Sequence, residues 1–206
     1  MSEPDSAFLK LKIDRADLVA WLEDRPPLAS HWADWRSLGG EYYFNGGRRD
    51  IADVPETELA KDLADCDAQL RGYATNRAAL RELLVSDDEP YMTRIAYDPE
   101  QREFVAGTLT YSENLFDFIV FLTVARGAAR RLSPDGYGVA AIHDFIWGAQ
   151  DEQATRAALR LGPGDKSEFM AASERASAAG AFQPIAHEIL AAPSPPPSRN
   201  ELETLK

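Results

Sequence analysis

The chain has 206 residues, of which 45% are hydrophobic and 27% are charged, so it is long enough to bury one sizeable core. Its 34 acidic residues outnumber its 22 basic residues, and the net charge of −12 argues against nucleic acid and anionic membranes as partners. The single cysteine, Cys66, excludes an intramolecular disulfide and cysteine-rich zinc modules, and it fits a reducing compartment. Because the N-terminus is acidic and the longest apolar run is too short to cross a bilayer, we expect a cytoplasmic protein.

The N-terminal part predicts a strand followed by a short helix. Residues Phe8 to Ile13 alternate between apolar side chains and lysines, which is the pattern of a half-buried strand. Asp14 can cap the helix, and Pro26 ends it because proline lacks the backbone N–H and disfavours helix in the residue before it. A short strand at Tyr42 to Phe44 then leads into a turn at Asn45-Gly46-Gly47.

Two amphipathic helices are predicted next. Asp53-Val54-Pro55-Glu56 is typical of a helix start, with a capping aspartate and a glutamate three residues later that can reach back to it. The helix then carries one buried stripe, formed by Leu59, Leu63, Cys66 and Leu70. A thiol on such a stripe has a raised pKa and is a poor nucleophile, so we expect Cys66 to be a core residue. Thr75 can cap a second helix that reaches Leu84.

The middle of the chain predicts a hairpin and a central helix. Met92 to Tyr97 and Arg102 to Tyr111 are strand-like and are joined by a turn with proline at its second position. Asn114 can cap a helix that runs to about Leu132, with arginines near its C-terminus, where cations suit the helix dipole. The alternative is a strand, because Phe118 to Phe121 is β-favourable, but almost 20 residues pass without a turn signal, which favours helix.

The C-terminal third changes in composition. Tyr137 to Trp147 is predicted to be a long strand, and the alanine-rich sequence from about residue 149 is predicted to be helical. Residues 193–206 have no apolar periodicity and are expected to form a disordered, dispensable tail. The sequence therefore predicts a single α+β domain over residues 1–192, with a small, mainly antiparallel sheet packed by a central helix and a helical C-terminal portion. The predicted sheet includes the Tyr42 strand.

Candidate catalytic residues are few and dispersed. The three histidines show no metal-ligand spacing, and no motif indicates a cofactor. His143 and Asp144 are neighbours in a predicted strand, so their side chains point to opposite faces and cannot form a dyad by themselves. The Arg48-Arg49 pair follows a glycine turn and could hold an anion, but it lacks the lysine and the following helix of a phosphate loop.

The most distinctive feature is the placement of acidic residues. Residues 50–67 contain seven carboxylates and one lysine, a net charge of −6 and half of the excess of the whole chain. On a helical wheel Glu58, Asp62 and Asp65 share one flank of the leucine stripe. Such a flank is either a solvated helix face in an acidic protein or a surface that meets a basic partner.

Two classes of function remain. The first is an acidic cytoplasmic binding protein, in the role of an immunity protein or a secretion chaperone, which covers the basic active site or binding face of a toxin or effector. Complementary charge speeds encounter and fixes the register of such complexes, and Glu58, Asp62 and Asp65 are the residues expected to contact the partner. The second is a small enzyme that uses His143, Asp144 and the Arg48-Arg49 loop. The absence of a recognisable catalytic motif favours the binding protein.

Overall fold

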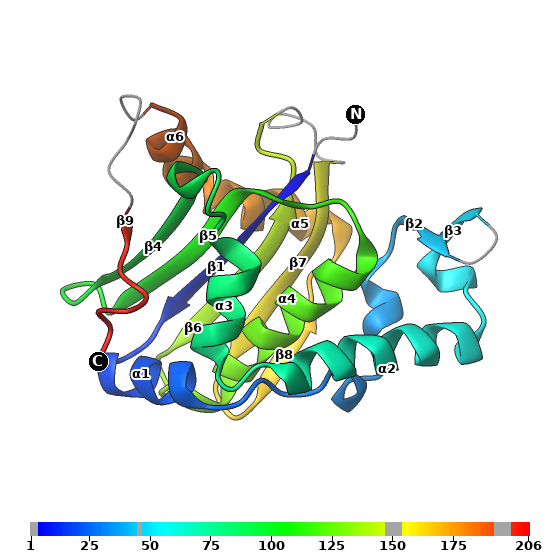
Figure 1. The fold of residues 1–206 in the computed structure, drawn as a ribbon, viewed down its shortest axis with the longest axis horizontal. Coiled ribbons are helices and arrows are strands. Elements are labelled where there is room, and N and C mark those ends of the chain that lie inside the picture. The colour runs from blue at the N-terminus through cyan, green and yellow to red at the C-terminus, as the bar shows by residue number, and fades with distance from the viewer. Residues whose placement is uncertain (1–3, 45–46, 147–153, 192–198) are drawn as a thin grey trace.

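A seven-stranded sheet runs through the centre of the molecule (Figure 1). The computed structural model of the chain describes residues 4–44, 47–146, 154–191 and 199–206. The order of the strands is β8-β7-β6-β1-β5-β4-β9; the first six are antiparallel, and β9 is parallel to β4. The strands of this sheet are β1 (Asp5–Lys12), β4 (Thr93–Asp98), β5 (Glu103–Ser112), β6 (Tyr137–His143), β7 (Thr155–Gly162), β8 (Lys166–Phe169) and β9 (Arg199–Asn200). The α+β class predicted from the sequence is confirmed.

The first strand, β1, lies in the middle of the sheet. Its residue Leu9 pairs with Ala106 on β5 and with Ala140 on β6. The predicted alternation holds, because Leu9 belongs to the core on one face of the sheet and Phe8 to the core on the other. The β4–β5 hairpin is also confirmed, with the Asp98 carboxylate accepting the backbone N–H groups of Glu100 and Gln101 in the turn.

Four helices cover the first face of the sheet: α1 (Arg15–Glu23), α2 (Glu56–Gly72), α3 (Asn76–Leu84) and α4 (Leu115–Gly127). Helix α4 is buried almost all round, and Asn114 caps it by accepting the backbone N–H of Asp117 at 2.8 Å. The alternative interpretation of this segment as a strand is wrong. Thr75 likewise caps α3 by accepting the backbone N–H of Ala78. Pro55, rather than Asp53, is the residue before α2.

Two short helices, α5 (Ala172–Gly180) and α6 (Gln183–Ala191), pack on the second face, behind the sheet in Figure 1. The ring of Phe8 stacks on Phe182 and meets Phe145 edge-on, with both pairs of ring centroids 5.4 Å apart. Gly107 on β5 makes room for Phe8, since a Cβ at this position would lie 2.1 Å from the ring. Both faces of the sheet are therefore packed, whereas the sequence predicted one central helix.

The alanine-rich segment predicted to be helical from about residue 149 begins, in its described part, as a β-hairpin. Strands β7 and β8 pair from Leu159 opposite Phe169 to Gly162 opposite Lys166. Along β7 the buried residues Thr155, Ala157, Leu159 and Leu161 alternate with the exposed Arg156 and Arg160, and only Ala158 departs from this pattern. The prediction was wrong here because it followed the alanine content of the segment rather than this alternation. The predicted helical character is found in α5 and α6.

The predicted disordered tail is corrected for residues 199–206. Strand β9 pairs with β4, and Leu202 and Leu205 are 0% and 3% exposed within the main core. Two leucines three residues apart are too short a pattern to register as periodicity. Residues 193–198 lie outside the described residues.

The Tyr42 strand forms a small sheet of its own rather than part of the main sheet. Strands β2 (Glu41–Phe44) and β3 (Gly47–Asp50) pair only with each other among the described residues. The predicted turn at Asn45-Gly46 lies outside the described residues. The strand predicted for Tyr137 to Trp147 ends at His143, and Trp147 is also outside the described residues.

Arg126, one of the arginines predicted near the C-terminus of the central helix, lies in the last turn of α4 and is buried there. Its side chain is completely buried and donates two hydrogen bonds to the Asp34 carboxylate, at 2.8 and 2.9 Å. The guanidinium carbon lies 4.8 to 5.0 Å from the ring centroids of Trp32, Trp35 and Phe169. This arginine therefore fastens the segment between α1 and β2 to the end of α4.

Candidate interaction surface

The three carboxylates predicted to contact a partner do share one flank of α2. The pKa of Asp62 is raised, first by partial burial and then by the negative charges of Glu58 and Asp65. These charges can raise the pKa of Asp62 only from nearby, so the three groups lie on one side of α2, as the helical wheel indicated. Asp65 is exposed and Asp62 is half-buried.

Glu58 differs from the other two because it already has a cationic partner in the chain. Its carboxylate lies 2.6 Å from the Arg49 guanidinium on β3, and its side chain is only 17% exposed. The same guanidinium lies 5.5 Å from the centroid of the Phe44 ring on β2. Glu58 therefore ties the β2–β3 hairpin to the helix, and the outward part of the flank consists of Asp62 and Asp65.

The start of α2 is held from the other side by Arg36. This guanidinium donates to the carbonyls of Ile51 and Ala52 at 2.9 and 3.0 Å and to that of Val54 at 2.7 Å. It also forms an ion pair of 3.1 Å with Glu56 in the first turn of α2. The hairpin and the acidic end of the helix are thus fixed relative to each other by two arginines.

The hairpin itself has one buried and one exposed face. Tyr42 points inward and meets the Phe118 ring of α4 edge-on, with the centroids 6.1 Å apart. Burial raises the pKa of its hydroxyl well above the ordinary value. Tyr43 points outward and is 83% exposed, beside the cross-strand ion pair of Arg48 and Glu41. Figure 1 shows the hairpin beyond one end of the main sheet, next to the N-terminal end of α2.

We define the acidic surface as Asp62 and Asp65 on α2. Tyr43 is a separate exposed aromatic side chain, because it lies on the hairpin face opposite Tyr42 and Arg49, the residues that contact α4 and α2. Tyrosine supplies a large contact area at a low cost in conformational entropy, which is why it is enriched at the centres of protein interfaces. Sequence reasoning missed Tyr43, although the run Tyr42-Tyr43-Phe44 in a strand must place its middle residue on the opposite face from its neighbours.

The residues suggested for an enzyme have separate environments. His143 is 5% exposed; its Nδ1 lies 2.8 Å from the Thr155 hydroxyl and its ring centroid 4.3 Å from that of Phe145. Burial lowers its pKa, opposed by the charge of Asp144, so the imidazole is neutral at pH 7. The contacts described for Arg48 and Arg49 are with other groups, Glu41 and Glu58. The contacts described here therefore do not bring His143 and the Arg48-Arg49 loop together into one site.

A buried carboxylate near the same end of the sheet was not predicted. Asp5, at the start of β1, is 5% exposed and lies 3.3 Å from the Arg156 guanidinium of β7. Burial raises its pKa to about 6, although Arg156 acts in the opposite direction. The sequence signal was weak because Asp5 precedes the alternating run that identified the strand.

Cys66 is a core residue, as predicted. It is completely buried, and its Sγ lies 3.8 Å from the carbonyl oxygen of Phe116. Burial, together with the charge of Asp62 and neighbouring carboxylates, raises the pKa of the thiol to about 12. A thiol with this pKa carries almost no thiolate at pH 7, as a core cysteine does.

Within the described parts of the chain, no group of three or more His, Cys, Asp or Glu side chains is placed to hold a metal ion. The same residues contain no helix whose length and apolar character would let it cross a bilayer. No protein-family model matches the sequence, and comparison with curated proteins and with solved structures finds no significant similarity. Any function must therefore be argued from the surface and the contacts of this chain.

Proposed function

We propose that this chain is a cytoplasmic binding protein that neutralises or chaperones a basic protein, such as a toxin or an effector, and that the acidic surface docks this partner. The observation that carries the proposal is the pair of outward carboxylates Asp62 and Asp65 on α2, the helix that the Arg49–Glu58 ion pair ties to the hairpin exposing Tyr43. Negative charges and an exposed aromatic side chain are groups that a basic protein face would recognise. The net charge of −12 adds long-range attraction for a cationic partner.

The two carboxylates and Tyr43 have different expected roles. The carboxylates of Asp62 and Asp65 act mainly on the rate of encounter, because exposed charges steer association and are screened by salt. Tyr43 acts mainly on the lifetime of the complex, because a buried aromatic contact must be broken before the partner leaves. The proposal therefore predicts that substitutions of Asp62 and Asp65 change mainly the association rate, and that substitution of Tyr43 changes mainly the dissociation rate.

The partner is first captured on the immobilised chain from a lysate of its native cell and identified by mass spectrometry. The association rate of the purified partner is then measured over a salt series. We expect the double variant Asp62→Asn and Asp65→Asn to associate about tenfold more slowly at low salt, with a flatter salt dependence. Asp87→Asn with Asp88→Asn is the matched control, since it removes the same charge from an exposed loop between α3 and β4.

Tyr43→Ala is expected to raise the dissociation rate at least about tenfold, while leaving the association rate within about twofold. Tyr137→Ala is its control, because Tyr137 is also exposed, at 49%, and lies at the start of β6. If the control variants change the kinetics as much as the test variants, the acidic surface is not the docking surface. Failure to capture any basic protein in stoichiometric amount would reject the proposed function itself.

A further inference from the structure

Asp5 and Arg156 meet at the end of the main sheet where β1 and β7 begin (Figure 1). Both residues lie at irregularities of the strand pairing. The register between β1 and β5 shifts between Asp5 and Ala7. In β7, Arg156 has no partner in the register with β6, because Ile142 and His143 pair with the residues on either side of it. A bulge of this kind re-aims a side chain, and bulges are frequent beside functional sites.

Asp5 holds the Arg156 guanidinium by one edge only. The Nε atom lies 3.3 Å from the Asp5 carboxylate, which is buried, whereas the arginine side chain is 47% exposed. The terminal nitrogens, Nη1 and Nη2, donate no hydrogen bond to any residue that the structure describes. The buried carboxylate therefore orients the guanidinium and leaves its outer pair of nitrogens available for paired hydrogen bonds with a planar anion.

A tyrosine hydroxyl near this arginine also has no partner. Tyr42 on β2 is 7% exposed, and its hydroxyl forms no hydrogen bond with the described residues. Burial raises the pKa of this hydroxyl, and the charges of Arg156 and Arg175 oppose the rise, which they can do only from nearby. The hydroxyl is therefore protonated at pH 7, and it is a hydrogen-bond donor without an acceptor.

Arg175 on α5 fixes the segment before Tyr42 against the bulge of β7. Its guanidinium donates to the Arg156 carbonyl at 3.3 Å and to the carbonyl that precedes Gly39 at 2.8 Å. Gly39 and Gly40 have φ values of 67° and 89°, which favour glycine. A Cβ on Gly39 would lie 3.6 Å from Nη2 of Arg175, and one on Gly40 would lie 3.4 Å from the Tyr42 hydroxyl. This chain of contacts brings the hydroxyl and the bulge together from different elements.

We propose that Arg156 and Tyr42, with Asp5 as a positioning residue, form a binding site for the carboxylate group of a small molecule, here called the Arg156 site. The guanidinium donates to both carboxylate oxygens, and the tyrosine hydroxyl supplies a third hydrogen bond. A singly charged anion suits the site better than a phosphate dianion, because the negative charges of Glu113 and Asp144 also act on Asp5. The site goes beyond the acidic surface, which attracts cations, and does not depend on it.

Acetate is the first probe, and acetamide, which has the same shape without the charge, is its control. The Nε–Hε signal of Arg156 is followed by NMR of the full ¹⁵N-labelled chain at constant ionic strength. We expect a saturable shift with acetate, with a dissociation constant in roughly the millimolar range because so small a ligand makes few contacts, and none with acetamide. Phosphate should bind at least about tenfold more weakly. Absence of a saturable acetate shift, or phosphate binding as tight as that of acetate, would overturn the proposal.

The source of the carboxylate is tested with trialanine, which presents a peptide C-terminus. We expect it to bind within about threefold of acetate, because the Arg156 site contacts the carboxylate alone. An affinity at least about tenfold above that of acetate would identify a peptide terminus as the ligand and would overturn the assignment to a small molecule.

Tyr42→Phe separates binding from stability, because the hydroxyl that it removes has no partner in the described chain. We expect acetate to bind at least about tenfold more weakly, with a thermal midpoint within about 1 °C of wild type. Tyr137→Phe is the control, since it removes a hydroxyl from an exposed tyrosine at the start of β6. Unchanged acetate affinity in Tyr42→Phe, or a clear loss of stability, would show that the hydroxyl does not serve a ligand.

Arg156→Lys keeps a cation beside Asp5 but lacks the planar pair of nitrogens, so acetate should bind at least about tenfold more weakly. Arg156→Met should abolish binding, read in both variants at the backbone amide of Ala157. Arg160→Met is the matched control, because it removes the same charge from the same strand and from a side chain that is also 47% exposed. Its acetate affinity should stay within about twofold of wild type. Equal losses at Arg156 and Arg160 would mean that acetate responds only to the overall charge, and the proposal would be wrong.

Discussion

The buried arginine at the end of α4 allows a sharp test of how this fold tolerates a charge in its core. Arg126 is 0% exposed, whereas the side chain of its partner Asp34 is 38% exposed. Removing Asp34 leaves a cation that cannot reach water, but removing Arg126 leaves a carboxylate that can be hydrated. The two partners of one ion pair should therefore have unequal effects on stability.

The magnitudes follow from the two environments. Asp34→Ala removes both charge-assisted hydrogen bonds, and the buried Nε of Arg126 already has no acceptor among the described residues. We expect a loss of about 3 kcal/mol in the free energy of unfolding. Arg126→Met keeps an apolar side chain among Trp32, Trp35 and Phe169, so it should lie within about 1 kcal/mol of wild type.

Urea denaturation of wild type, both single variants and the double variant measures these differences as shifts of the midpoint at constant slope. The double variant should be about as stable as Arg126→Met alone, because Asp34 matters only while the buried cation is present. Additive losses, or a larger loss for Arg126→Met than for Asp34→Ala, would refute the reasoning.

Two further predictions concern single buried groups. The pKa of Asp5 is raised to about 6, against about 4 in the unfolded chain, so its contribution to stability is complete below pH 4 and is lost as the pH rises through 6. The free energy of unfolding of wild type, measured by urea denaturation, should therefore fall over this pH range by an amount on the order of 2 kcal/mol. Asp5→Asn should remove this fall, and a variant whose stability depends on pH as that of wild type does would contradict the prediction. Cys66→Ser places a hydroxyl in an apolar stripe and should cost about 1 to 3 kcal/mol in thermal or urea unfolding, whereas a variant as stable as wild type would show that the site is more polar than the structure indicates.

Local signals in the sequence predicted the elements whose caps and turns are made by residues next to them in the chain. Asn114 and Thr75 cap the helices expected of them, and the Asp98 turn joins β4 to β5. The prediction failed where composition was given more weight than local pattern. Thr155–Gly162 lies in the alanine-rich part of the chain, yet its buried residues alternate with the exposed Arg156 and Arg160 except at Ala158.

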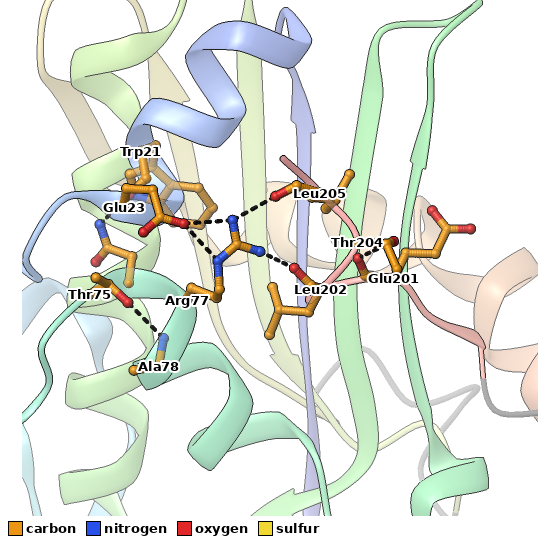
Figure 2. Close-up of polar contacts among 10 residues, drawn as sticks. Trp21, Glu23, Thr75, Arg77, Ala78, Glu201, Leu202, Thr204 and Leu205 are labelled. Atoms are coloured by element: carbon orange, nitrogen blue, oxygen red, sulfur yellow. Dashed lines mark hydrogen bonds and ion pairs between the residues drawn. The ribbon is translucent and has the colours of Figure 1, made fainter.

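For the candidate site, the positions of the carboxylates on α2 were predictable from the sequence, but their contacts were not. The shared flank of Glu58, Asp62 and Asp65 follows from the helical period alone. The engagement of Glu58 by Arg49 was not predictable, because it depends on how the β2–β3 hairpin folds back against α2. The hydrogen bonds that Arg77 on α3 donates to the carbonyls of Leu202 and Leu205 (Figure 2) could not be predicted either, because these acceptors lie more than a hundred residues further along the chain.

The central position of β1 delays folding during synthesis. The two neighbours of β1 are β5 and β6, so the sheet cannot close before the ribosome has passed His143. At ordinary rates of translation this wait is on the order of 10 s, which is long compared with the formation of a helix. Strands β4 and β5 precede α4 in the chain, so when α4 emerges β1 has a partner on one side only and the sheet still lacks β6 and β7. The nascent chain therefore presents its most hydrophobic segment to the cell while only part of the sheet can cover it, and binding of chaperones to the ribosome-bound chain should peak between the emergence of α4 and that of β6.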